Sequence, residues 1–405
     1  MRTVLEHSTA VLELLSSLPN KLGTQQLPLV QALGRALAND VHAPVSLPPF
    51  DNSQMDGYAI RAADLGPDGG PLPLVATIAA GTAASDLPAG YAAPIMTGAM
   101  MPPGADAVIP VEAAAPNTFD FLNGTNEGLT VSLPPVTRGA FVRERGGDIL
   151  AGDVALRAGT ALGAAQLGLL AGLGIATVEV TTLPTALLLA TGDEVVQPGG
   201  ELNAGQIFDA NSTLLAASME AAGVKVIQLR ASADNPDALR AHLDEALDGV
   251  ELIVTSGGIS KGAFEVVRQA MAGDSAVVDF VSVAMQPGGP QGLGTYRGVP
   301  LLAFPGNPVS SLLSFEMFLR PALTSLFGSP APRPVVRAKL REPLSSPRAK
   351  HQLRRAVLHA DGTVAVMGGP GSHLLSAAAA SNAVVHVPVD VQELKTGADV
   401  EVWML

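Results

Sequence analysis

The chain has no cysteine, a single tryptophan and few charged residues, which make up 15% of its 405 positions. Without cysteine it forms no disulfide, uses no thiolate nucleophile and holds no iron–sulfur cluster through thiolates. Basic residues are scarce as well: 24 Lys and Arg stand against 37 Asp and Glu, and the formal net charge is −13. An acidic surface disfavours free nucleic acid and anionic membranes as partners. A strongly anionic ligand would therefore need a local basic site.

A hydrophobic targeting segment is also lacking. Glu6 and Glu13 interrupt the N-terminal stretch, which does not resemble a signal peptide. The stretch between Arg157 and Glu179 has no charged side chain and is long enough to cross a bilayer. It contains Gln166 and several glycines, however, and its helical spacing stops at a Gly-Leu-Gly sequence. We therefore expect no membrane span and a cytoplasmic location.

Glycine and proline, by contrast, are abundant, with 43 and 32 residues. A chain of this length exceeds what one core usually serves, so we expect two to four domains. Residues 4–15 and 28–38 have helical patterns, and short β-runs follow, among them 108–111, 119–122 and 129–133. Strands then alternate with helices from 183 to 327, which predicts a parallel sheet, and β-runs return from 330.

The expected fold class is therefore α/β plus β, with several domains. A central parallel α/β domain would carry an inserted all-β domain, a helical N-terminal domain and a C-terminal β-barrel or sandwich. The predicted boundaries are 1–44 with 145–180 for the discontinuous N-terminal domain, 45–144 for the insertion, 181–329 for the α/β domain and 330–405 for the last domain.

Three apolar runs of the α/β segment each end in a loop suited to a ligand. The run 250–254 is followed by Ser-Gly-Gly, and the run 301–304 by Pro-Gly-Asn-Pro and the start of a helix. The run 187–190 ends in Thr-Gly-Asp-Glu, and a fourth loop holds Asp209 and Asn211. Glycines let backbone N–H groups approach an anion, and open α/β sheets bind ligands at the carboxyl ends of their strands.

The order of these motifs resembles one known family. TGDE, Asp209-Ala-Asn211, SGGIS and PGNPVS occur in the order of the molybdopterin molybdenumtransferases, the MoeA proteins and the gephyrin E domain. SQMDGYA at 53–59, Ile95-Met-Thr-Gly98 and RGGDI at 145–149 resemble motifs of the same family. The resemblance runs from about Leu12 to the C-terminus and implies a molybdopterin-binding type of α/β domain.

The resemblance implies a reaction in which adenylylated molybdopterin and molybdate are the substrates and AMP is released. Mg²⁺ would be the cofactor, since hard cations prefer carboxylate oxygens. The implied catalytic residues are Asp56, Asp148, Glu194 and Glu265, with Asp56, Asp148 and Asp209 as metal ligands. The implied substrate-binding residues are Thr97, Asp193, Asn211, Ser256, Gly257, Gly258, Ser260, Lys261, Pro287, Gly288, Pro305, Gly306, Asn307, Pro308, Ser310, Arg355 and Ser376.

Each carboxylate also has a structural interpretation. Asp56 in Met-Asp-Gly and Asp148 after two glycines are both typical of turns. Asp209 is equally suited to be the N-cap of the next helix, and Glu265 falls in a predicted first helical turn, where acids are favourable in any case. The sequence leaves these alternatives open.

Two departures from the family pattern concern charge. Gln286 and Gly289 stand where the family commonly has lysines in a KPGKP loop, so two point charges for an anion are missing. A basic stretch between 333 and 355 and Lys261 are the candidate replacements. Within that stretch the resemblance favours Arg355, together with the loop 372–376.

The family resemblance further implies a homodimer with its site at the subunit interface, and a molybdopterin adenylyltransferase as the upstream partner. Two alternative functions remain. In the first, the chain itself is a molybdopterin adenylyltransferase, whose domain resembles residues 183–327. In the second, it is a non-enzymatic, gephyrin-like scaffold.

Overall fold

The computed structural model of the chain describes residues 1–122, 126–192, 194–230, 235–259, 266–273 and 275–405. Two compact units account for them. The first unit comprises residues 1–39, 158–163 and 178–405, and the second comprises 40–157 and 164–177. Each has hydrophobic cores of its own, so the chain leaves the first unit, builds the second and returns.

The first unit contains most of the helices and the two large sheets. Its helical elements are α1 (Val4–Leu15), α2 (Leu18–Leu22), η1 (Leu29–Gln31), α4 (Ala210–Ala221), α5 (Pro236–Ala246), α6 (Val266–Ala270), α7 (Pro308–Ser314), the π-helical turn η4 (Phe315–Leu319), α8 (Arg320–Phe327) and α9 (Leu375–Ala379). Its strands up to residue 304 are β1 (Thr24–Pro28), β11 (Thr177–Thr181), β12 (Thr185–Ala190), β13 (Val195–Val196), β14 (Ile207–Phe208), β15 (Lys225–Arg230), β16 (Leu252–Ser256), β17 (Ala276–Ser282), β18 (Met285–Gln286), β19 (Pro290–Tyr296) and β20 (Val299–Phe304).

The central sheet has the strand order β15-β12-β16-β20-β19-β17. The first four strands pair in parallel, and β19 and β17 add two antiparallel strands at one edge. Since β15 and β16 lie on opposite sides of β12, the connections diverge between β12 and β16. Such a point is where open α/β sheets bind ligands.

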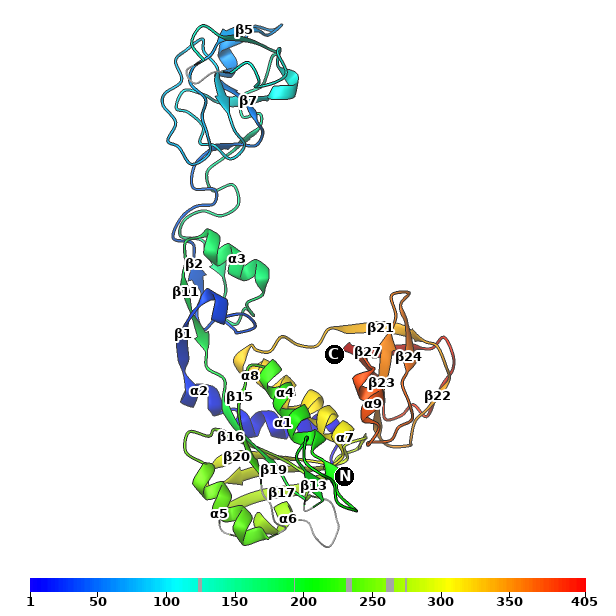
Figure 1. The fold of residues 1–405 in the computed structure, drawn as a ribbon. Coiled ribbons are helices and arrows are strands. Elements are labelled where there is room, and N and C mark those ends of the chain that lie inside the picture. The colour runs from blue at the N-terminus through cyan, green and yellow to red at the C-terminus, as the bar shows by residue number, and fades with distance from the viewer. Residues whose placement is uncertain (123–125, 193, 231–234, 260–265, 274) are drawn as a thin grey trace. The chain divides into compact units, whose positions relative to one another are not determined.

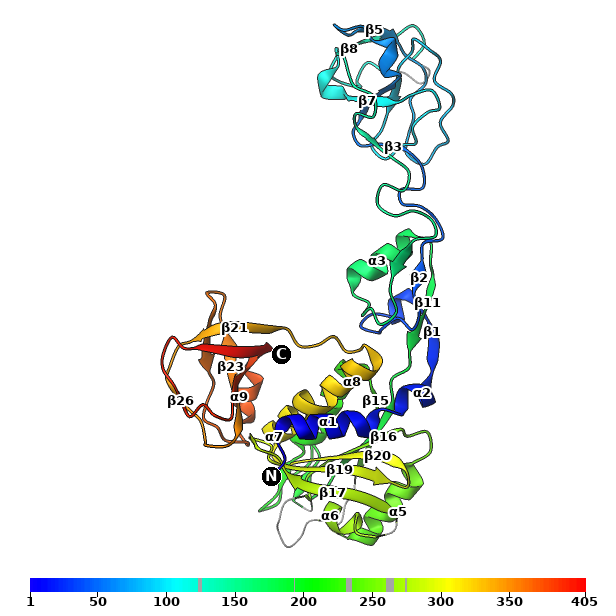
Figure 2. The ribbon, with the colours of Figure 1, turned by 180° about the vertical axis from the view of Figure 1, so that it is seen from behind.

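Successive side chains along each strand point to opposite faces of the sheet. Leu188 and Val254 belong to one core, and Leu187 and Ile253 belong to the other. Helices α1, α4, α7 and α8 cover the first face, and α5 and α6 cover the second, as Figure 1 and the reverse view in Figure 2 show. Both faces are apolar because both are covered.

The C-terminal residues form a closed barrel. Its strands are β21 (Val335–Leu340), β23 (His351–Leu358), β24 (Thr363–Val366), β25 (Ala383–Val387) and β27 (Asp399–Met404), joined by the short pair β22 (Leu344–Ser345) and β26 (Glu393–Leu394). The order β23-β24-β21-β27-β25 closes when β25 pairs with β23. Closure removes the free sheet edges of this barrel.

The second unit is mainly β-structure around two small cores. Its elements are β2 (Val41–His42), β3 (Asn52–Ser53), β4 (Gly57–Ile60), η2 (Ala62–Asp64), β5 (Gly70–Pro73), β6 (Ala93–Ile95), β7 (Ala107–Pro110), η3 (Val111–Ala113), β8 (Thr130–Leu133), β9 (Val142–Arg143), β10 (Val154–Leu156) and α3 (Ala164–Gly172). Strand β4 pairs with both β6 and β7 and forms the centre of this unit.

The predicted fold class is confirmed: a mostly parallel α/β sheet, an inserted β-unit, an N-terminal helix and a C-terminal barrel are all present. The predicted helix at 4–15 is confirmed as α1, which begins at a capping box of Thr3 and Glu6. Across the described ranges, the apolar stretch before Glu179 included, the helices are too short or too polar for a bilayer crossing.

Two local predictions were wrong. Residues 28–38 form no amphipathic helix, because backbone pairing with distant segments replaces helical bonds: Gly34 N–H donates to Leu162 O at 2.8 Å and Leu37 N–H to Thr160 O at 3.0 Å. Residues 119–122 form a turn rather than a strand. The ring of Phe119 instead packs edge-on against Tyr58, with centroids 5.4 Å apart.

Candidate active site

The turns after β12, β16 and β20 line a single cleft of about 900 Å³ within the first unit. The loop after β18 and part of the barrel complete its lining. Most of the predicted site residues of this unit therefore meet in one place. Those that line the cleft are Glu194, Asp209, Asn211, Ser256, Gly257, Gly258, Pro287, Gly288, Pro305, Gly306, Asn307, Pro308 and Ser310.

Glycines allow the two central turns to touch. Gly257 and Gly258 have φ angles of +92° and +65°, which side chains rarely adopt. A Cβ on Gly306 would lie 3.3 Å from the Cα of Gly257, and one on Gly258 would lie 3.0 Å from the backbone N of Val267. The turns thus pack backbone against backbone, and a side chain at any of these positions would force them apart.

A short polar network ties these turns to α4. The Asn211 amide donates to Ser256 Oγ at 2.9 Å and to Gly306 O at 2.5 Å. Ser256 Oγ also lies 3.2 Å from Ser311 Oγ in α7. Asn211 and Ser256 thus hold the cleft wall in shape.

The first turn of α7 offers fewer free donors than its sequence indicates. Pro308 has no N–H, and Ser311 N–H donates to Asn307 O at 3.0 Å. Val309 N–H donates to Ser372 O of the barrel at 3.1 Å. The contact with Ser372 joins the barrel to this wall of the cleft, so part of the expected anion-binding capacity is used for domain contact.

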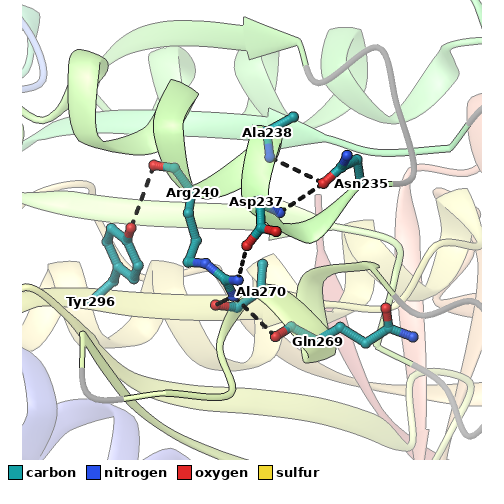
Figure 3. Close-up of polar contacts among 7 residues, drawn as sticks. All are labelled: Asn235, Asp237, Ala238, Arg240, Gln269, Ala270 and Tyr296. Atoms are coloured by element: carbon teal, nitrogen blue, oxygen red, sulfur yellow. Dashed lines mark hydrogen bonds and ion pairs between the residues drawn. The ribbon is translucent and has the colours of Figure 1, made fainter.

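Polar contacts behind the cleft secure α6, as Figure 3 shows. Arg240 donates to the Ala270 and Gln269 carbonyls at 3.0 and 3.4 Å, and forms an ion pair with Asp237 at the start of α5. Helix α6 in turn supports the glycine turn, because Arg268 N–H donates to Gly258 O at 3.1 Å. Arg240 therefore holds the cleft from outside and does not line it.

Asp209 is a helix cap. Its two carboxylate oxygens accept hydrogen bonds from Ser212, one from the backbone N–H at 2.9 Å and one from Oγ at 2.5 Å. The side chain is buried at the N-terminus of α4. Ser212 thus uses one acceptor position on each oxygen. The geometry gives Asp209 a capping role, and its predicted role as a metal ligand gains no support from it.

Glu194, in contrast, is exposed and lines the cleft. Its carboxylate bends back over Gly192, where a Cβ would come within 2.8 Å of Oε2. The absence of a side chain at Gly192 therefore gives this carboxylate its room.

The loop where lysines are missing closes the cleft near the barrel. Gln286 accepts a hydrogen bond from the Gln352 amide at 2.7 Å, which leaves its side chain engaged with β23. Gly288 has a φ of +95°, whereas Gly289 lies outside the left-handed region and a Cβ there would meet no atom closer than 3.4 Å. Position 289 can therefore carry a side chain.

Arg355 lies under a barrel loop of the cleft. Its guanidinium donates to Gly371 O at 3.0 Å and to Gly369 O, the side chain is 2% exposed, and burial lowers its pKa. Gly371 and Ser372 line the cleft, whereas Arg355 and Ser376 do not. Sequence reasoning thus selected the right loop but missed Ser372, although Ser372 is the first residue of the loop 372–376 that the resemblance favours.

Lys350 is a charged lining residue that sequence reasoning did not single out. It comes from the turn before β23 and is half-buried. The sequence placed it among several basic residues of the last domain and contained no signal to separate it from them.

The second unit brings Asp56 and Thr97 together. Thr97 donates to Asp56 Oδ1 through its backbone N–H at 2.6 Å and its hydroxyl at 2.8 Å. These two hydrogen bonds, the backbone one foremost, lower the pKa of Asp56. Asp56 is exposed, as is Asp148 on the loop after β9. Thr97 therefore keeps Asp56 ionised with Oδ2 left over for a ligand.

Protein side chains alone do not form a metal site in the described part of the chain. Among the described residues, no cluster of three or more Asp, Glu or His side chains has the geometry to hold an ion. Mg²⁺ requires only one or two carboxylates when substrate phosphates and water complete its shell. Asp56 fits that pattern through its Oδ2. Asp193, Ser260, Lys261 and Glu265 lie outside the described residues.

The cleft and its motifs agree with known families. The model for the MoeA N-terminal region (domain I and II) matches residues 2–174, that for a probable molybdopterin binding domain matches 187–325, and that for the MoeA C-terminal region (domain IV) matches 337–405. Molybdopterin molybdenumtransferase 2 of Mycobacterium tuberculosis is 41% identical over the full length of both chains. The chain belongs to the molybdopterin molybdenumtransferase family.

Other members agree in sequence and in fold. The molybdopterin molybdenumtransferase of Haemophilus influenzae is 32% identical, with 96% of each chain covered. The crystal structure of the molybdopterin biosynthesis MoeA protein from Pyrococcus horikoshii covers all of both chains with a TM-score of 0.82 and 26% identity. The family prediction made from the motifs is thus confirmed.

Proposed function

We propose that the chain transfers molybdenum from molybdate to adenylylated molybdopterin and releases AMP. It is an enzyme of molybdenum cofactor biosynthesis, in keeping with the molybdenumtransferases that it matches over its full length. The cleft where the family motifs converge carries the proposal, because about 900 Å³ is ample for a nucleotide-sized ligand and its turns are suited to anions.

The roles of the cleft residues follow from their contacts. The backbone N–H groups of Gly258, Gly306 and Asn307 would bind phosphate oxygens, and Ser310 would add a side-chain donor. Ser256, Gly257 and Asn211 would act by holding the turns in place, because their donors already bond protein atoms. Pro287, Gly288, Pro305 and Pro308 would shape the walls. Such sites act mainly by positioning and by charge neutralisation. Glu194 would orient the attacking group, because it is the exposed carboxylate of this cleft among the described residues.

Asp56 and Asp148 are also proposed to act in the reaction, with Mg²⁺ as cofactor. Bound Mg²⁺ would neutralise charge on the phosphoanhydride that is cleaved. Asp56 would contribute Oδ2 to the ion, and Thr97 would act by holding Asp56 rather than by touching substrate. Asp209 is left out of the ligand set, since its oxygens bond Ser212. Asp193, Ser260, Lys261 and Glu265 remain proposed contributors on the family pattern alone.

We also propose a homodimer whose partner subunit completes the site, a molybdopterin adenylyltransferase as the supplier of the substrate, a cytoplasmic location, and the four-part domain division predicted from the sequence. Light scattering tests the dimer: a monomer with full activity would contradict it.

Reconstitution tests the reaction itself. The purified chain, adenylylated molybdopterin, molybdate and Mg²⁺ are mixed, and AMP release and pterin-bound molybdenum are measured together. We expect both to appear, and both to fail when molybdate or Mg²⁺ is omitted. AMP release without metal insertion would contradict the proposal. Adenylylation of free molybdopterin by ATP would favour the adenylyltransferase alternative, and a stable peptide partner with neither activity would favour the scaffold.

A further inference from the structure

The cleft contains little positive charge for a site that binds anions. Among its described lining residues the ionisable side chains are Glu194, Asp209 and Lys350. Two of these are acids, and the loop that pairs with the start of β23 presents the neutral Gln286 and Gly289. An oxyanion placed here would be repelled by Glu194, so a cation within reach of the cleft is needed to offset it.

The fold fixes the backbone from which Lys350 projects. Ala349 before it has a φ of +59°, a sharp turn for a residue with a side chain. His351 after it donates its N–H to Ala284 O at 2.8 Å, and β23 pairs in parallel with β18, with Met285 opposite His351. Lys350 therefore stands directly before the point where the barrel is joined to the Gln286–Gly289 loop, and only its side chain is free to move.

The other basic residues of the same stretch are committed elsewhere or lie off the cleft. Arg333 pairs with Glu316, Lys339 with Asp399, and Arg341 with Asp361, at 2.7, 2.7 and 2.9 Å. Arg354 and Arg355 donate to backbone carbonyls of the loop 368–371. Lys350 has no carboxylate within ion-pair distance in the described part of the chain, and it alone of this stretch lines the cleft.

We propose that Lys350 binds the tetrahedral oxyanion in this cleft and supplies the charge that Gln286 and Gly289 lack. The inference rests on the proposed function, because it assumes that the cleft receives molybdate and the phosphates of a nucleotidyl substrate. Either source presents a negatively charged tetrahedral group, and an ammonium on a flexible stem suits such a group as a point charge.

Calorimetric titration separates the two sources. The wild-type chain, Lys350→Ala and Arg348→Ala are each titrated with molybdate and, in a second arm, with AMP. Arg348 is the matched control, because it loses the same charge two residues away, is exposed and does not line the cleft. We expect Lys350→Ala to weaken at least one anion about tenfold, the effect of losing one half-buried charge-assisted hydrogen bond. Arg348→Ala should leave both affinities unchanged.

The arm that weakens identifies the anion that Lys350 holds. Weakening of molybdate alone assigns it to the metal oxyanion, and weakening of AMP alone assigns it to the phosphate. Unchanged affinity for both anions in Lys350→Ala would overturn the inference, as would an equal loss in Arg348→Ala or a wild-type chain that binds neither anion.

Moving the charge provides a second test. In the Lys350→Ala background, Gly289→Lys places an ammonium on the neighbouring loop of the cleft, at a position whose backbone accepts a side chain. We expect the affinity to return to within about threefold of wild type; a variant that folds but does not recover would count against an electrostatic role. These titrations measure binding without turnover. If Lys350→Ala lowers the anion affinity but the wild-type chain does not insert molybdenum, the proposed function is rejected and the inference still stands.

Discussion

Asp56 and Asp209 are both aspartates in family motifs, and the family resemblance implies a metal-ligand role for both, yet their surroundings differ. Asp56 is exposed, has a lowered pKa and accepts on one oxygen only, from Thr97. Asp209 is buried, and its two oxygens cap α4 through Ser212. A motif thus selects both positions without distinguishing an exposed carboxylate with one oxygen left over from a buried one that caps a helix.

Asp56→Asn should lower the rate of molybdenum insertion more than substitution of Arg355, Asp209 or Thr97. The substitution keeps the volume but removes the charge from Oδ2, so we expect molybdenum insertion to fall roughly a hundredfold, the loss of a few kcal/mol of charge stabilisation. AMP release under saturating molybdate measures it. An unchanged thermal unfolding curve serves as the control, and wild-type turnover would remove Asp56 from the site.

Arg355→Ala tests whether a buried arginine supports a loop of the cleft or contacts the substrate itself. Its guanidinium holds the Gly369 and Gly371 carbonyls, so its removal should loosen the loop that carries Ser372. We expect substrate affinity to fall about tenfold, with a smaller change in kcat, and the unfolding free energy to fall by about 1–3 kcal/mol as the carbonyls lose their donor.

Arg341→Ala is the matched control for Arg355, because Arg341 is an exposed arginine of the same barrel that pairs with Asp361. It should change neither quantity by a measurable amount. If Arg355→Ala left stability intact while abolishing turnover, Arg355 would touch substrate directly.

Asp209→Ala tests the capping role. Loss of an N-cap typically costs about 1 kcal/mol, and we expect that cost in denaturant unfolding, with turnover per folded molecule preserved. Asp209→Asn should restore the stability, since asparagine is an equally good cap. A large loss of turnover in the asparagine variant would show that the charge at 209 is used in the reaction.

Thr97→Val should have the smallest effect. It removes the hydroxyl bond but keeps the backbone one, so the pKa of Asp56 should rise toward the ordinary value of 3.8. A depressed carboxylate pKa contributes stability that is present above 3.8 and is lost as pH falls through the folded value. The variant should therefore lose that contribution at a higher pH than wild type. NMR titration of the Asp56 carboxyl measures the change, and an unaltered midpoint would contradict it.

Local pattern was enough to predict the strands that carry the site. Apolar runs that end in Ser-Gly-Gly and Pro-Gly-Asn-Pro became β16 and β20. The glycines were expected to let the backbone approach an anion, and in the structure they let the two turns approach each other. The failure at 28–38 has an equally physical cause. Val30 and Leu33 have helical spacing, but they are exposed, and the backbone bonds of this segment go to residues 160 and 162. No local pattern contains that pairing.

Side-chain direction was the part that sequence could not supply. Lys350 and Arg355 are five residues apart in one basic stretch, yet one lines the cleft and the other lies under a loop. The difference arises from the pairing of β23 with β18 and β25, which depends on the closed barrel. Ser372 was likewise missed in favour of Ser376, which lies in α9 and does not line the cleft.

Turnover of Asp56→Asn and Asp209→Asn, measured side by side with wild type as AMP release from adenylylated molybdopterin in the presence of molybdate and Mg²⁺, tests the central claim most directly. Both variants lose one negative charge and keep their volume. The geometry predicts that Asp209→Asn stays within about twofold of wild type while Asp56→Asn falls roughly a hundredfold. Equal losses in the two variants, or a larger loss in Asp209→Asn, would contradict the assignment of Asp56 to the reaction and Asp209 to the wall.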